Sequence, residues 1–240
     1  MKTIAVLVAM PMEAAPLIKR MEGGRPETRA GKKFLCGRMG RAEVVLHICG
    51  MGMRNAARGA KSLVENYQPD VLVNFGVSGG FVPGIALFDT IIAQSSCPAS
   101  SRDDTAEPMD ERLANFAKQV LPHAQIAPVA TSIGLIVNKK RKARLAAKCG
   151  AVCIDMETYA IAKISRELGV PLLVIRCMSD TVEPSSLLHF FKNGALAAEK
   201  VAGELESVIS RYDRRPAGLF PGHVHGQTLQ AGDQQEPGQA

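Results

Sequence analysis

Residues 71–80 read VLVNFGVSGG, and residues 172–180 read LLVIRCMSD. Both segments begin with apolar residues that would occupy both faces of a strand, which is typical of a central strand covered by helices on either side. We expect strands at 70–75 and 171–177, each leading into a polar or glycine-rich segment. Ligands of open α/β sheets gather at such strand ends.

Working outward from these two segments, short β-branched runs alternate with helical patterns. The expected strands are 3–9, 33–38, 43–49, 70–75, 88–94, 126–132, 151–154 and 171–177, and the expected helices are 12–21, 54–67, 108–121, 139–148, 157–168 and 185–211. This alternation predicts an α/β fold with three layers, α/β/α.

The length of 240 residues is enough for one large domain with a sizeable core. We expect a single catalytic domain over 1–212, and a flexible tail over 213–240, where apolar residues become scarce. No apolar run approaches the roughly 18 residues of a membrane span. The net charge of +6 comes with no Trp and only 3 Tyr, a composition that does not indicate nucleic-acid binding.

Cysteines, basic residues and histidines give weaker signals. The 6 cysteines are expected to be buried and reduced, as in a cytoplasmic protein. The basic run 139–144 is interpreted as a solvated helix face, with binding of a phosphate or an acidic partner as the alternative. His223 and His225 lack a third ligand, so no metal site is expected.

Acidic residues follow three of the predicted strands. Glu13 follows the first strand, Glu157 follows the short strand 151–154, and Asp180 follows the last. Each of the first two could simply complement a helix dipole. Together they predict three carboxylates around one glycine-lined pocket, which suggests acid–base work. The glycines at 76, 79 and 80 would leave backbone amides open to a ligand.

The order and spacing of these motifs resemble the nucleoside phosphorylase superfamily, and within it the methylthioadenosine/S-adenosylhomocysteine nucleosidase-like branch. The resemblance covers roughly 1–212 and is carried by AMPME at 9–13, GMG at 50–52, NFGVSGG at 74–80, DMETYAIA at 155–162 and VPLLVIRCMSD at 170–180. It implies a phosphorylase/hydrolase-like α/β fold with a central mixed, partly barrel-like sheet. It also implies an enzyme that cleaves the bond between a purine and its ribose.

The resemblance assigns catalytic roles. Asp180 would protonate the purine N7, with a pKa raised by desolvation, and Ser179 would orient it. Glu157 would accept hydrogen bonds from the ribose hydroxyls, and Glu13 would take a proton from the attacking water. The remaining residues expected to bind substrate are Met10, Met51, Gly76, Ser78, Gly79, Leu135, Ile136, Val137, Met156 and Arg176.

Several of these residues have specific expected contacts. Met156 would pack on the sugar, Arg176 would brace the carboxylates, and the segment 135–137 would contact the base. Met10 and Met51, with Met12 and Met53, would form a soft apolar pocket for the 5′ substituent, unless they are ordinary core. The expected substrate is therefore a 5′-substituted adenosine-type nucleoside.

Other functions stay open. A carboxylate at Glu13 suits water better than phosphate, but a phosphorylase with phosphate as co-substrate is the main alternative. Val77 stands where the nucleosidases often carry Ser, and 134–137 lacks an aromatic residue, which leaves room for futalosine-hydrolase-like or hopanoid-associated relatives. A non-catalytic nucleoside-binding protein is a further alternative. An NAD-dependent enzyme is disfavoured by the incomplete glycine fingerprint at 50–55.

The resemblance also implies a homo-oligomer, either a dimer or a trimer-based assembly. It calls for no metal and no organic cofactor.

Overall fold

A computed structural model describes residues 1–80, 82–99, 105–134, 136, 138–181 and 187–214, except for the side chains of 139 and 187–191. The tail predicted at 213–240, with His223 and His225, lies almost entirely outside the described residues. Among the helices described, none is long and apolar enough to cross a membrane.

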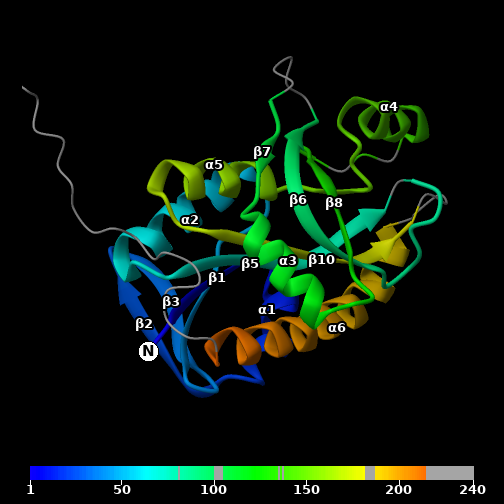
Figure 1. The fold of residues 1–240 in the computed structure, drawn as a ribbon. Coiled ribbons are helices and arrows are strands. Elements are labelled where there is room, and N and C mark those ends of the chain that lie inside the picture. The colour runs from blue at the N-terminus through cyan, green and yellow to red at the C-terminus, as the bar shows by residue number, and fades with distance from the viewer. Residues whose placement is uncertain (81, 100–104, 135, 137, 182–186, 215–240) are drawn as a thin grey trace, which may run out of the picture.

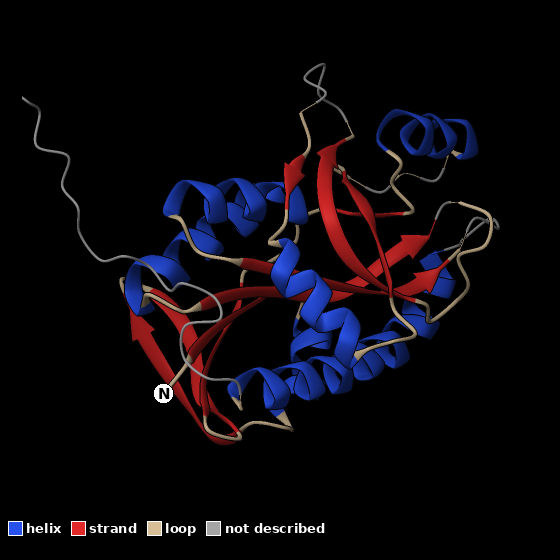
Figure 2. Ribbon diagram, in the orientation of Figure 1, coloured by secondary structure: helices blue, strands red, loops and turns tan. Residues whose placement is uncertain are grey.

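One large mixed sheet forms the centre of the molecule (Figure 2). Its strands are β1 (Thr3–Val8), β2 (Glu22–Arg29), β3 (Lys32–Met39), β4 (Ala42–Ile48), β5 (Val71–Gly80), β6 (Thr90–Pro98), β7 (Glu107–Pro108), β8 (Gln125–Thr131), β9 (Cys153–Asp155) and β10 (Leu172–Asp180). Parallel pairs join β4, β1, β5 and β10 in that order. The carboxyl ends of these four strands therefore lie along one edge.

Part of the sheet closes on itself. β10 pairs in parallel with β5 and antiparallel with β6, while β6 continues through β8 and β9 back to β5. These pairings form a ring of five strands: β5, β10, β6, β8 and β9. In an open sheet the two outermost strands have an unpaired edge, whereas in the ring each strand has a neighbour on both sides. The predicted mixed, partly barrel-like sheet is confirmed.

Helices cover both faces of the sheet (Figure 1). They are α1 (Pro11–Ile18), α2 (Met53–Tyr67), α3 (Glu111–Val120), α4 (Lys139–Cys149), α5 (Thr158–Leu168) and α6 (Leu187–Asp213). Residues of α1, α3 and α6 share one core with the odd-numbered residues of β5. Residues of α2 and α5 pack on the other face. The predicted three layers are confirmed.

The two central strands are longer than the sequence predicts. The strand expected at 70–75 runs to Gly80, and the one expected at 171–177 runs to Asp180. The ladder continues because β10 pairs with β5 as far as Gly79 and β9 pairs with its last two residues. The glycine-rich segment is therefore part of the strand, and the expected ends of the two strands at 75 and 177 were wrong.

Two further expectations about the elements need correction. β2 was not predicted, because its residues are almost all exposed and show no apolar periodicity. The helix expected from residue 108 begins at Glu111, since the Asp110 carboxylate accepts hydrogen bonds from the amides of Arg112 and Leu113 and so caps the helix.

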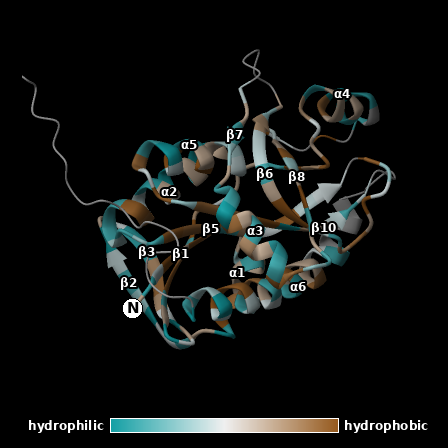
Figure 3. Cartoon of the chain, in the orientation of Figure 1, coloured by the Kyte–Doolittle hydropathy of each residue, from teal (hydrophilic) through white to brown (hydrophobic). Residues whose placement is uncertain are grey.

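The basic run 139–144 begins α4, the hydrophilic helix at the upper right of Figure 3. Lys140, Arg141 and Arg144 are exposed, as expected for a solvated face. Lys142 is only 4% exposed. It lies three residues before the buried Leu145, on the face of α4 that is turned toward the sheet.

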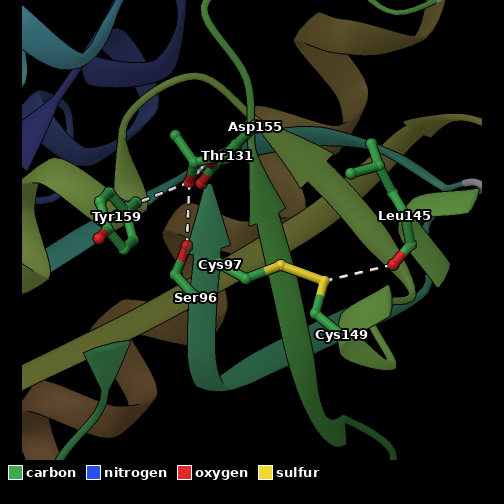
Figure 4. The surroundings of a disulfide bond; sticks show 7 residues. All are labelled: Ser96, Cys97, Thr131, Leu145, Cys149, Asp155 and Tyr159. Carbon is green, nitrogen blue, oxygen red and sulfur yellow. Dashed lines mark hydrogen bonds between the residues drawn. A yellow bond between two sulfur atoms is a disulfide. The ribbon is translucent and has the colours of Figure 1, made fainter. Parts of the chain in front are cut away.

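The prediction that all cysteines are reduced is contradicted for one pair. Cys97 in β6 and Cys149 at the end of α4 form a disulfide across a sequence separation of 52 residues (Figure 4). The sequence could not indicate this pair, because its members belong to separate elements that only the tertiary fold brings together. Cys36, Cys49, Cys153 and Cys177 are free.

Reduction of this disulfide should destabilise the protein. A cross-link that closes a loop of this length restricts the unfolded chain, and such links typically contribute roughly 2–4 kcal/mol. We expect a reducing agent to lower the urea midpoint of the wild type and to leave that of a Cys97→Ala/Cys149→Ala variant unchanged. Equal midpoints for the wild type with and without reductant, together with alkylation of both thiols in the unreduced protein, would contradict the pairing.

Candidate active site

Glu13 is the first carboxylate at the carboxyl edge of the sheet. It is the third residue of α1, and its Oε2 accepts hydrogen bonds from the backbone N–H groups of Met10, at 2.9 Å, and Ala9, at 3.2 Å. The bond to Met10 is one half of a capping box. Oε1 reaches across to β5 and accepts a bond from the amide of Val77 at 2.9 Å. Glu13 therefore does more than complement a helix dipole.

Glycine at position 76 makes this reach possible. A Cβ atom at Gly76 would lie 2.2 Å from Glu13 Oε1, closer than any real contact. The carboxylate thus occupies the space that a side chain on β5 would fill. The expected role of Gly76 was to expose a backbone amide, whereas its observed contribution is room for Glu13.

Glu157 lies at the start of α5 and turns back toward the strand ends. Its Oε1 accepts a hydrogen bond from the amide of Gly52 at 2.7 Å, and its Oε2 accepts one from Met156 at 3.1 Å. Gly52 has a φ of +95°, which favours glycine at this position. The turn after β4 and the start of α5 are joined at this carboxylate.

Burial and neighbouring charge both alter the ionisation of these acids. Burial raises the pKa of Glu157 to about 7, with a further contribution from the negative charge of Asp155. Burial also raises the pKa of Glu13, against the opposing effect of its hydrogen bonds and of Arg176. The negative charge of Glu13 adds a smaller contribution to the raised pKa of Glu157.

Arg176 pairs with Asp155 in the interior. Its Nη2 lies 2.8 Å and its Nε 2.9 Å from Asp155 Oδ2. Nη2 also donates to Thr158 Oγ1 at 2.8 Å and to Asn74 Oδ1. The expectation that Arg176 braces the carboxylates agrees with these contacts, and the carboxylate it pairs with directly is Asp155.

Sequence reasoning missed Asp155, Asn74 and Thr158 as parts of this site. Asp155 stands two residues before Glu157 in the same motif, and Asn74 is a polar residue inside an apolar strand. An unexplained polar residue in a buried strand needs a partner. A buried polar residue of this kind was recognisable at Asn74, but the sequence does not indicate which residue is its hydrogen-bond partner.

Asp180 ends β10, beside Ser179 and the glycines of β5. Ser179 Oγ donates to Asp180 Oδ1 at 3.2 Å and lies 3.4 Å from the carbonyl oxygen of Ser78. A Cβ at Gly79 would lie 3.0 Å from Asp180 Oδ2. Gly79 is three residues beyond Gly76 on the same strand, so Asp180 and Glu13 contact β5 about 10 Å apart.

Other predicted residues lie as follows. Met10 and Met156 are half-buried and Met51 is 58% exposed, and Met10 packs against the core that α1, α3 and α6 share with β5. Ser78 Oγ donates to the carbonyl of Ile154. Ile136 is buried in a small apolar cluster with Cys97 and Leu145. Leu135 and Val137 lie outside the described residues.

Within the described residues, no three His, Cys, Asp or Glu side chains come together as a metal site would need.

A family model described as the Phosphorylase superfamily matches residues 3–210. The chain belongs to the phosphorylase superfamily. Two relatives are 5′-methylthioadenosine/S-adenosylhomocysteine nucleosidases, from Geobacillus kaustophilus (strain HTA426) and Geobacillus thermodenitrificans (strain NG80-2). They are 29% and 30% identical, over 86% of this chain and 96% and 95% of their own. The predicted resemblance to this branch is confirmed, as is the prediction of an enzyme of this superfamily.

Solved structures of the superfamily share the fold. The S-adenosylhomocysteine nucleosidase of Streptococcus pyogenes, in complex with 5-methylthiotubericidin, has a TM-score of 0.82 at 20% identity, over 88% of this chain and 97% of its own. A futalosine hydrolase mutant of Helicobacter pylori strain 26695 has a TM-score of 0.83 at 19% identity, over 88% of this chain and 100% of its own.

A methyl group at Gly76 should disturb the site. We expect Gly76→Ala to lower the free energy of unfolding by roughly 1–3 kcal/mol, because the new Cβ forces Glu13 out of its hydrogen bonds. Urea unfolding measures this change. The matched control is Gly24→Ala in β2, where the nearest atom lies at 3.9 Å. Equal midpoints for the two variants would contradict the close approach.

The raised pKa of Glu157 should make stability depend on pH. Between its ordinary value of 4.5 and about 7, the folded state binds more protons than the unfolded state at this group. The free energy of unfolding should therefore fall as pH rises through this window, by up to roughly 3 kcal/mol. Glu157→Gln should remove this part of the pH dependence, as measured by urea unfolding from pH 5 to 8.

The exposed Glu65, which pairs with Lys61 on its own helix, provides the control. Glu65→Gln should leave the pH dependence of unfolding as it is in the wild type. A Glu157→Gln profile parallel to the wild type across the window would show that Glu157 is ionised as easily as a surface carboxylate.

Proposed function

We propose that this enzyme hydrolyses the N-glycosidic bond of a 5′-substituted adenosine-type nucleoside and releases free adenine. Its place in the phosphorylase superfamily and its similarity to named nucleosidases support this class of reaction. In the proposed reaction, the bond between C1′ and the purine breaks, its electrons move into the base, and water supplies the hydroxyl that bonds to C1′.

The observation that carries the choice of water over phosphate is the position of Glu13. The amide of Val77, which a phosphate could have used, is bonded to the Glu13 carboxylate at 2.9 Å. Arg176, whose positive charge lowers the pKa of Glu13, is already paired with Asp155 at 2.8 Å. A phosphate needs donors and positive charge around its oxygens, and here a buried acid stands in their place.

Glu13 is proposed as the general base. A base works best when its pKa lies near the working pH, and burial raises the pKa of Glu13. In this role it would take one proton from water as the oxygen bonds to C1′. Glu157 is proposed to accept hydrogen bonds from the ribose hydroxyls, with Met156 packing on the sugar. The half-buried Met156 and the buried Glu157 are adjacent in the chain, which supports this pairing of roles.

Asp180 is proposed to protonate N7 of the leaving purine, which offsets the negative charge that moves into the base. The hydrogen bond from Ser179 would orient its carboxyl group. Asp180 contacts β5 at Gly79, close to the end of the strand, and Glu13 contacts the same strand at Gly76, so both acids lie toward the carboxyl end of β5.

The 5′ substituent is proposed to be apolar and to lie against Met10 and Met51. The 58% exposure of Met51 leaves this thioether accessible, and methionine adapts to irregular apolar groups. Adenine contact by 135–137, a homo-oligomeric state and a cytoplasmic location stay predictions from the sequence.

A substrate panel tests the reaction. Adenosine, inosine, futalosine and adenosines with methylthio or longer apolar 5′ groups are incubated with and without phosphate, and free base is measured. We expect adenine release from the 5′-apolar adenosines at the same rate in both conditions. Strict dependence on phosphate would identify a phosphorylase. Binding of these nucleosides without base release would identify a non-catalytic protein.

The same assay tests the proposed residues. Asp180→Asn and Glu13→Gln should each lower kcat about 10²–10⁴-fold, the usual contribution of a positioned acid or base. Glu65→Gln should retain the wild-type rate. Near-normal turnover of either site variant would remove that residue from its proposed role.

A further inference from the structure

A chain of buried hydroxyl groups leads from β6 to the start of α5. Ser96 Oγ lies 3.0 Å from Thr131 Oγ1, and Thr131 Oγ1 lies 2.7 Å from Asp155 Oδ1 (Figure 4). The backbone N–H of Tyr159 donates to Thr131 Oγ1 at 3.0 Å. Ser96 and Thr131 are fully buried. No role in substrate binding or proton transfer falls to Ser96 or Thr131 in the mechanism proposed above.

The chemistry of these groups fixes the direction of each hydrogen bond. Asp155 is paired with Arg176 and so accepts only, which means that the single hydroxyl proton of Thr131 goes to Asp155. The two lone pairs of Thr131 then accept from Tyr159 N–H and from the Ser96 hydroxyl. Thr131 therefore uses its whole hydrogen-bonding capacity, and only one orientation of its side chain satisfies all three bonds.

These bonds replace the cap that α5 lacks. The residue at the N-cap position is Glu157, whose side chain makes no capping bond, because its carboxylate is turned toward Gly52. Asp155 Oδ1 instead accepts from the amides of Glu157 and Thr158, both at 3.3 Å. Thr131 takes the next amide, that of Tyr159. The first turn of a helix needs such acceptors.

We propose that Thr131 is a positioning residue, which holds Asp155 and the first turn of α5 so that the Glu157 carboxylate stays directed at the ribose. Thr131 does not touch the substrate in this proposal. It frees Glu157 from capping its own helix, and Glu157 can therefore bind a ligand. The proposal rests on the proposed role of Glu157.

Replacement of the hydroxyl by a methyl group isolates this effect. Thr131→Val keeps the shape but leaves Tyr159 N–H without an acceptor and Asp155 Oδ1 without its shortest donor. We expect KM for the panel nucleoside with the highest kcat/KM to rise about 10-fold, in keeping with the loss of a hydrogen bond to a charged group, with a smaller change in kcat. Thr131→Ser, which keeps the hydroxyl, should restore KM to within about twofold.

Thr90→Val is the matched control. Thr90, in β6, is buried like Thr131 and also donates to a carboxylate, that of Glu204, at 2.9 Å. It takes no part in the site. It should lower stability without raising KM. Hydrogen exchange of the peptide covering 156–162, followed by mass spectrometry, should become faster in Thr131→Val and stay unchanged in Thr90→Val. The hydrogen-exchange measurement does not depend on catalytic activity.

The outcomes separate this proposal from the proposed function. If Glu157→Gln leaves KM unchanged, the ribose role of Glu157 is wrong. If Glu157→Gln raises KM while Thr131→Val has the KM and exchange rates of the wild type, the positioning role of Thr131 is wrong. When Thr131→Val is added to Glu157→Gln, we expect no further rise in KM. A full additional rise would show that Thr131 acts by a route other than Glu157.

Discussion

The buried ion pair between Arg176 and Asp155 is the interaction on which the rest of the site depends. Their side chains are only 3% and 2% exposed. Removing two charges from water costs several kcal/mol per ion, and such a pair is tolerated only when its remaining hydrogen-bonding groups are satisfied. Asn74 and Thr158 meet this requirement for Arg176, and Thr131 meets it for Asp155. Loss of either charged residue alone would leave the other buried and unpaired.

The ion pair also links separate parts of the sheet. Asp155 ends β9 and Arg176 lies within β10, and both strands border β5. The pair therefore joins strands on either side of β5 and fixes the position from which α5 begins. Its charges act on the acids nearby, because Asp155 raises the pKa of Glu157 while Arg176 lowers that of Glu13 and of Glu157. The same contact thus sets both geometry and ionisation.

Glycines give the carboxylates access to the backbone. Glu13 occupies the space beside Gly76, Asp180 lies against Gly79, and Glu157 is bonded to the amide of Gly52. In many anion-binding loops, glycine amides would bind a phosphate. Here two of the amides near these glycines are satisfied by the protein's own acids. This arrangement is the physical basis for favouring water as the nucleophile.

The sequence by itself determined the layers and most of the elements, and it predicted which acids would form a site. Apolar runs such as 71–75 indicate burial on both faces of a strand, and acids that follow strands indicate the edge of the sheet where a ligand is expected. The tertiary structure alone decided that β5 and β10 continue as a ladder, that Cys97 meets Cys149, and that Asp155 holds Arg176. Periodicity records how a residue relates to its own strand or helix. Strand pairing and buried hydrogen bonds depend on residues far away in the chain, such as Thr131 and Tyr159, so only the folded protein specifies them.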